Sequence, residues 1–216
     1  MHFVRTDKTT HFQRVFQQLK KYGFLLESDP QLPSVCSLIN GGPSKSSWWS
    51  HPMAQVIFTV NEELEDHQDV LITKLVTGKV TFVHRSLWPE LNAIGTSRED
   101  WQMNKLSDPA RLLLQSIDER GSVMTNELSP LGPGKVRVGD VARELEKSLL
   151  IIAAQIHTPS GAHAKVLETW AHWAERIGFK SAKVIVSAAK KAWEERLLKL
   201  NQEFDAAAKL PWQRSS

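Results

Sequence analysis

The most informative stretch of the chain covers residues 107–168 and reads SDPARLLLQSIDERGSVMTNELSPLGPGKVRVGDVARELEKSLLIIAAQIHTPSGAHAKVLE. It opens with Asp108 and Pro109, an N-cap residue followed by a proline in the first helical turn. Gly121 is of the residue type that commonly follows the last turn of a helix. Between them, apolar residues recur at helical spacing: Ala110, Leu113, Leu114 and Ile117. We therefore predict a helix that ends at Gly121.

The remainder of this stretch predicts a short helix, a longer helix and a β-hairpin. Thr125 can cap a brief helix within residues 122–128, and apolar spacing marks a further helix over residues 138–149. An apolar strand (149–156), a tight turn (157–161) and a second strand (162–167) complete the segment. Helix, short helix, helix and hairpin is the order of a winged helix-turn-helix, a fold used mostly to bind duplex DNA.

Composition places the chain among ordinary globular proteins. It has 216 residues, of which 41% are hydrophobic and 24% charged. No apolar run reaches the ~20 residues that span a bilayer, and residues 1–22 are too polar for a secretory signal. Cys36 is the single cysteine, which excludes an intrachain disulfide and a cysteine-based zinc cluster. We therefore expect a cytoplasmic protein that has no membrane partner.

The formal net charge of +3 is unevenly distributed. Residues 1–106 are neutral, residues 107–168 carry a net charge of −1, and residues 169–216 carry +4. Neutralisation of phosphates supplies most non-specific affinity for DNA. The excess positive charge therefore lies in the C-terminal helices and not in the segment with winged-helix order.

We predict the fold class α+β, mainly α, with an N-terminal helix and β-hairpin unit (1–106) and a winged-helix unit with trailing helices (107–216). The alternative is that both pack as one compact domain. Further helices are expected over residues 8–22 and 53–66, and from Leu87 to Gly95, where the glycine would end the helix. The last helix is predicted to begin at Ser181, with Ile185, Trp193 and Leu197 facing inward.

A hairpin is predicted over residues 70–84, because two runs of β-forming residues flank Thr77 and Gly78. If those two residues form the turn, Lys74 and Lys79 lie together on a partly apolar face. The opposite face is then expected to hold Leu71, Thr73, Leu75, Val80, Phe82 and His84.

Candidate nucleic-acid contacts lie on the helix over residues 138–149, at the tip of the following hairpin and on the outer face of the last helix. Hydroxyls and imidazoles at the tip suit phosphate contacts. Against DNA contact by the helix stand its carboxylates, Asp140, Glu144 and Glu146. The predicted nucleic-acid-binding residues are Lys135, Arg137, Arg143, Lys147, His157, Ser160, His163, Lys165, Lys183, Lys190 and Lys191.

The chain has eight tryptophans, a high number for its length. Several lie in the N-terminal half, where together with basic residues they are a candidate cleft for stacking a base. Packing in the core is the commoner use of tryptophan. The candidate cleft residues are Trp48, Trp49, His51, Lys74, Lys79, Arg85 and Trp88.

No catalytic or metal-binding motif stands out in the sequence. The eight histidines match no zinc pattern, and the P-loop, Gly-x-Gly-x-x-Gly and Gly-x-Ser-x-Gly motifs are absent. We therefore predict no cofactor, no metal site and no catalytic residue, and we disfavour an enzyme.

Several short segments carry a resemblance to a known family. They are WWSHP at residues 48–52, KLVTGKVTFVHR at 74–85, LWP at 87–89, HTPSGAH at 157–163 and LETW at 167–170, followed by Trp173 and Ala174. These segments resemble AlkZ-related proteins of the winged-helix DNA glycosylase superfamily. The resemblance covers most of the chain and implies winged-helix units around a DNA channel, acting on alkylated or cross-linked bases.

One departure from that superfamily concerns its chemistry. Its glycosylases carry Gln-x-Gln or Gln-x-Asp to position the attacking water, and neither triplet occurs here. The nearest triplets are Gln102-Met103-Asn104 and Gln155-Ile156-His157. The resemblance therefore implies the fold without the catalytic motif.

Three hypotheses follow. The first is a DNA-binding protein of winged-helix type that is connected with DNA repair and has double-stranded DNA as its partner. The second is a divergent DNA glycosylase that acts on alkylated bases. The third is a winged helix used for protein–protein contact, which the net charge of −1 in residues 107–168 favours. The oligomeric state is left open.

Overall fold

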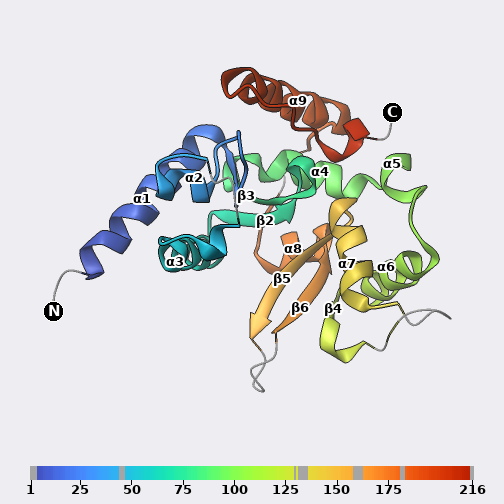
Figure 1. The fold of residues 1–216 in the computed structure, drawn as a ribbon. Coiled ribbons are helices and arrows are strands. Elements are labelled where there is room, and N and C mark those ends of the chain that lie inside the picture. The colour runs from blue at the N-terminus through green and yellow to red at the C-terminus, as the bar shows by residue number, and fades with distance from the viewer. Residues whose placement is uncertain are drawn as a thin grey trace. The chain divides into compact units, whose positions relative to one another are not determined.

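The computed structural model describes residues 4–43, 47–128, 130, 136–157, 163–180 and 183–214, with side chains from Thr10 onward apart from those of His157, His163 and Arg214. The fold is mixed α+β and mainly helical, as predicted (Figure 1). The chain forms two compact units: unit 1 is Met1–Trp88 with Ala192–Lys209, and unit 2 is Pro89–Lys191 with Leu210–Ser216. The sequence prediction placed a single division after residue 106, whereas here the chain returns to unit 1 within its last long helix.

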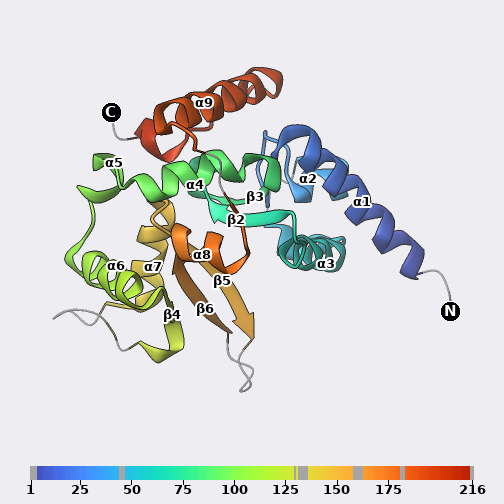
Figure 2. The same ribbon diagram turned by 180° about the vertical axis from the view of Figure 1, so that it is seen from behind.

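Unit 1 combines helices with a small antiparallel sheet of strand order β1-β3-β2. Figure 2 shows the same elements from behind. The elements are α1 (Val4–Tyr22), β1 (Phe24–Leu26), α2 (Val35–Asn40), η1 (Trp48–Ser50), α3 (Ala54–Glu65), β2 (Val70–Lys74), η2 (Val76–Gly78), β3 (Val80–His84), η3 (Arg85–Leu87) and the C-terminal part of α9 (Val186–Glu203).

The predicted hairpin is present as β2 and β3, but its predicted register was wrong. Lys74 pairs with Val80 and Ile72 with Phe82, so the connection runs from Leu75 to Lys79. A 3-10 turn occupies this connection, with Thr77 in the left-handed region at φ 55°. The longer connection changes the pairing by one residue, and Phe82 therefore shares a face with Ile72 instead of Leu71.

Each face of this sheet contributes to the core of unit 1. Phe82 and Leu25 pack in a buried cluster with residues of α1, α2 and α3. On the other face, the ring of Phe24 lies 5.5 Å from that of Trp193 in α9. Trp193 and Leu197 are buried as predicted, whereas Ile185, predicted to face inward, is 74% exposed.

Unit 2 holds α4 (Trp88–Ser97) from Pro89 onward and a second antiparallel sheet of order β4-β6-β5. Its core joins α6, α7 and all three strands. The remaining elements are α5 (Asp100–Met103), α6 (Asp108–Arg120), β4 (Ser122–Met124), η4 (Thr125–Glu127), α7 (Val138–Lys147), β5 (Ile151–His157), β6 (His163–Thr169), α8 (Trp170–Arg176), the start of α9 and η5 (Pro211–Arg214).

The helix over residues 108–120 forms as predicted, with Gly121 after its last turn at φ 77°. Its N-cap is Ser107 instead of Asp108, because the Ser107 hydroxyl accepts the hydrogen bond from the Ala110 amide. The brief second helix is reduced to the 3-10 turn η4, which follows the strand β4. β4 pairs with β6, so a third strand joins the predicted hairpin.

Gly95 does not end its helix, contrary to the prediction. It lies inside α4, where a Cβ atom would be only 2.5 Å from ring atoms of Trp170. The glycine therefore allows Trp170 to pack directly against the α4 backbone.

Candidate functional site

The helix α7 places basic side chains on an exposed surface of unit 2. Its buried side packs into the core through Val138, Val141, Ala142 and Leu145. Arg137, Arg143 and Lys147 are all exposed. Gly139, also exposed, has nothing within 4 Å of an added Cβ. The amphipathic pattern of α7 therefore separates an apolar anchor from a basic surface.

The carboxylates of α7 are mostly engaged within unit 2. Glu146 is buried, and one of its oxygens lies 3.3 Å from Lys165 Nζ. Both oxygens of Glu144 accept hydrogen bonds from Ser107. Asp140 is exposed and lies 3.3 Å from Arg143 Nη1. All three carboxylates weighed against DNA contact in the sequence, but Glu146 is buried and Glu144 is hydrogen-bonded to Ser107.

The structure describes only part of the predicted hairpin tip. His157 and His163 pair at the ends of β5 and β6, and their side chains are not described. Ser160 and Lys135 lie outside the described residues. Lys165 is placed on β6 beside Glu146, which makes its ammonium group part of an internal ion pair.

The predicted basic residues of the last helix have different environments. Lys183 and Lys191 are exposed. Lys190 points into unit 2, where its ammonium group lies 3.0 Å from Glu99 and 5.9 Å from the ring centre of Trp212. Hydrogen bonds from Trp101 and Lys190 lower the pKa of Glu99, although burial acts in the opposite direction. Lys190 thus has a clear structural role.

The candidate tryptophan cleft is assembled only in part. Trp48 is buried and stacks on Trp49 with ring centres 3.9 Å apart, while Trp49 remains 65% exposed. Trp88 is buried and donates a hydrogen bond to the Val83 carbonyl oxygen. The Nδ1 atom of His51 accepts a hydrogen bond from the Met53 amide, and this contact stabilises the turn before α3.

The basic residues named with this cleft belong to the sheet and its borders. Lys79 lies 2.7 Å from Asp29, and Arg85 lies 2.8 Å from Asp69. Lys74 is on β2 and half-buried. Lys79 and Arg85 therefore form ion pairs that stabilise the fold of unit 1. No contact that the structure describes joins either residue to Trp48 or Trp49.

Sequence reasoning missed a buried carboxylate in unit 2. Glu168, at the end of β6, is 1% exposed, and its two oxygens face His172 Nδ1 at 3.0 Å and the guanidinium of Arg176. The hydrogen bonds that the guanidinium donates to Glu168 raise the pKa of Arg176, although burial acts in the opposite direction. Glu168, His172 and Arg176 follow one another at intervals of four residues, and this spacing could have predicted the contact. The prediction would have required the position at which β6 ends and α8 begins.

The nearest counterpart of the glutamine motif is also structural. Gln102 is 1% exposed, and its amide nitrogen donates to the carbonyl oxygens of Ser148 and Leu149 at 3.1 and 3.3 Å. Its amide oxygen lies 3.0 Å from the Glu99 amide nitrogen and 3.0 Å from the Ser97 hydroxyl. All polar atoms of the side chain are therefore occupied, and Gln102 joins α5 to the junction between α7 and β5.

The described residues contain no group of three or more His, Cys, Asp or Glu side chains arranged to hold a metal ion. Among the helices that the structure describes, none combines the length and the apolar character needed to cross a bilayer.

The fold and the α7 surface define a mainly helical α+β protein with a three-stranded sheet in each unit and, in the second, a helix with exposed arginine and lysine side chains. Residues 9–210 match the model of the family described as AlkZ related, so the chain belongs to the AlkZ-related family and the predicted resemblance is confirmed. Membership of this family suggests a glycosylase-like superfamily that is connected with DNA repair. No curated protein and no solved structure matches the chain.

Proposed function

We propose that the protein binds double-stranded DNA through α7, as a winged-helix protein connected with DNA repair. The observation that carries the proposal is the exposed surface of α7, which holds Arg137, Arg143 and Lys147 while Glu144 and Glu146 are engaged elsewhere. Asp140 is also exposed on that surface, where it lies 3.3 Å from Arg143. This balance favours contact with phosphates and base edges.

The order of elements supports the winged-helix interpretation. The helices α6 and α7 are separated by β4 and the short turn η4, and α7 is followed by the antiparallel pair β5 and β6. In helix-turn-helix proteins, the residues at the N-terminal end of the second helix contact bases in the major groove. Arg137 immediately precedes α7 and Gly139 lies in its first turn, where the missing side chain permits close approach of a ligand to the backbone.

The proposal is tested by fluorescence anisotropy with a labelled duplex over a range of salt concentrations. Arg143→Gln combined with Lys147→Gln is expected to weaken binding about tenfold or more and to reduce the salt slope by roughly 0.9 for each phosphate that the variant no longer neutralises. Both side chains are exposed, so the fold is retained. Arg120→Gln, an equally exposed position in unit 2 on α6, is the matched control. Absence of duplex binding at low salt, or an equal weakening in the control, would contradict the proposal.

Membership of the AlkZ-related family favours a second candidate function, release of an alkylated base from duplex DNA. Incubation with an alkylated duplex and chromatographic detection of the free base tests it. Because Gln102 is fully hydrogen-bonded inside unit 2, we expect no release while duplex binding is intact. Release at a rate above that of the duplex alone would instead establish a glycosylase.

A further inference from the structure

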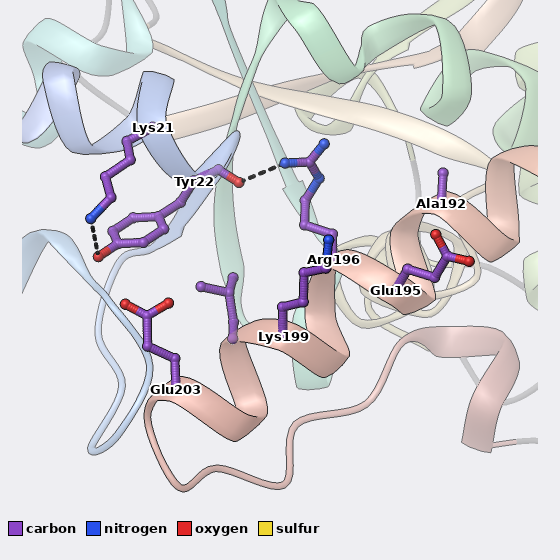
Figure 3. A pocket seen from close by; sticks show the side chains of 8 residues that line it. Lys21, Tyr22, Ala192, Glu195, Arg196, Lys199 and Glu203 are labelled. Carbon is purple, nitrogen blue, oxygen red and sulfur yellow. Dashed lines mark hydrogen bonds between the residues drawn. The ribbon is translucent and has the colours of Figure 1, made fainter.

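A pocket of about 400 Å³ opens in unit 1 between the C-terminal end of α1 and one side of α9 (Figure 3). This size lies within the range of small-molecule sites. Both contributing segments belong to the same unit. The pocket is lined by Lys21, Tyr22, Ala192, Glu195, Arg196, Lys199, Leu200 and Glu203.

Arg196 is held in place by the end of α1. Its Nη1 atom donates a hydrogen bond to the Tyr22 carbonyl oxygen at 3.3 Å, as the dashed line in Figure 3 shows. Gly23 leaves space for this contact, since a Cβ atom there would lie 3.3 Å from Nη1. A cation at this position also complements the helix dipole. This contact uses one of the five N–H donors of the guanidinium and holds the group in place. The other N–H donors can bind a ligand.

Two lysines supply further positive charge to the pocket. Lys199 follows Arg196 by three residues, which places both on the same side of α9. Lys199 makes no hydrogen bond or ion pair with any residue that the structure describes. Lys21 enters from α1, where its ammonium group lies 3.3 Å from the Tyr22 hydroxyl and 4.7 Å from the ring centre. Three cations from two helices thus line the pocket, with Lys21 at the Tyr22 hydroxyl and Arg196 at the Tyr22 carbonyl oxygen.

The carboxylates of Glu195 and Glu203 restrict the kind of ligand that this pocket can bind. Figure 3 shows Glu203 on the side of the Tyr22 hydroxyl, whereas Arg196 lies on the side of the Tyr22 carbonyl. Glu195 lines the pocket from α9 as well. A bare anion would meet Glu203 unfavourably, but a ligand with hydrogen-bond donors at its other end would satisfy that carboxylate. The buried side chain of Leu200 and the Tyr22 ring add apolar surface between the two ends.

We propose that this pocket binds a phosphate-bearing ligand of the nucleotide class. The phosphate is held by Arg196 and Lys199, and N–H or O–H donors of the base or sugar face Glu203. Arginine and lysine are the usual partners of phosphate groups. The site lies in unit 1, and its residues are different from those proposed for DNA binding by α7.

Calorimetric titration of the full chain at low salt with 2′-deoxyguanosine 5′-monophosphate, deoxyguanosine and inorganic phosphate tests the site. The monophosphate is expected to bind at least about tenfold more tightly than the nucleoside, and Lys199→Gln to weaken it by about tenfold or more. Lys20→Gln is the matched control, because Lys20 is exposed in the same turn of α1 as Lys21 but does not line the pocket. Thermal melts verify that each variant is folded.

Addition of an unlabelled duplex separates two sources of the phosphate. Displacement of the monophosphate assigns the pocket to the DNA backbone, and its retention assigns the pocket to a free nucleotide. The proposal is overturned if the wild-type chain does not bind the monophosphate, if the nucleoside binds equally well, or if Lys199→Gln and Lys20→Gln have the same effect. Because α7 is untouched in these variants, failure here leaves the proposed function standing.

Discussion

Both carboxylate oxygens of Glu144 accept hydrogen bonds from Ser107, one from its backbone nitrogen at 2.7 Å and one from its hydroxyl at 2.8 Å. The same hydroxyl accepts the amide hydrogen of Ala110 and caps α6. A residue of α7 is therefore joined directly to the first turn of α6. The contact also holds both oxygens of the Glu144 carboxylate against the start of α6.

Ser107→Ala is expected to lower the free energy of unfolding by about 1–2 kcal/mol, because it removes the helix cap and one partner of Glu144. The pair is exposed, so water screens its electrostatic part, and Glu144→Gln alone is expected to cost less than about 1 kcal/mol. Urea unfolding of the two single variants and the double variant measures the coupling. Strict additivity of the two effects would show that the residues do not interact in solution.

Two helical glycines of unit 2 are expected to respond oppositely to alanine. Gly95→Ala places a methyl group 2.5 Å from the Trp170 ring and should destabilise the protein by about 1–3 kcal/mol. Gly139→Ala meets open space in α7 and should stabilise by up to about 1 kcal/mol through helix propensity. Thermal melts of both variants test the pair. Equal shifts of Tm in one direction would be inconsistent with the packing at Gly95.

Elements with a strong periodic pattern could be predicted from sequence. The apolar spacing of α6 and α7, and the β-forming runs of the two hairpins, correspond to the observed elements because one-sided burial imposes a period. The connection over Leu75–Lys79 could not be predicted, since Thr77 adopts a positive φ that its residue type rarely favours. A connection of five residues instead of two shifts the register by one, and that shift is enough to reverse the expected faces.

The candidate site could be predicted less well than the fold. Residue type identified Arg143 and Lys147 as surface cations, but the partners of Glu144 and Lys190 come from distant segments, Ser107 and Glu99. Periodicity within one helix carries no information about such contacts. The pocket at Arg196 was missed for the same reason, because Lys21 and Lys199 are far apart in the chain.

Cys36 is expected to be unreactive until unit 1 unfolds. It is fully buried in the core, and burial raises the pKa of its thiol to about 11. At pH 8 the thiolate fraction is then only about one in a thousand. An unfolded thiol with a pKa of about 8.5 is roughly one-quarter ionised at that pH, so Ellman's reagent should label the native protein at least about a hundredfold more slowly than the urea-unfolded chain. Rapid labelling without denaturant would show that α2 opens readily.

The pKa of His84 is lowered by burial, with smaller contributions in the same direction from Lys20, Arg85 and His67 and an opposing one from Asp69. Its Nδ1 atom accepts a hydrogen bond from the Ser86 amide at 3.3 Å, which requires an unprotonated Nδ1. The unfolded chain therefore binds a proton more readily, at a pKa of about 6.5. The stability associated with neutral His84 is present above that pH and is lost as the pH falls through the lower folded pKa.

Urea unfolding at a series of pH values from about 7.5 to about 5 is expected to show this decrease in stability in the wild-type chain. His84→Asn retains an acceptor for the Ser86 amide but does not titrate, so it should reduce the slope of stability against pH while keeping most of the stability at neutral pH. The difference between the two curves isolates His84 from the other titrating groups. Parallel curves would mean that the His84 pKa is the same in the folded and unfolded chains.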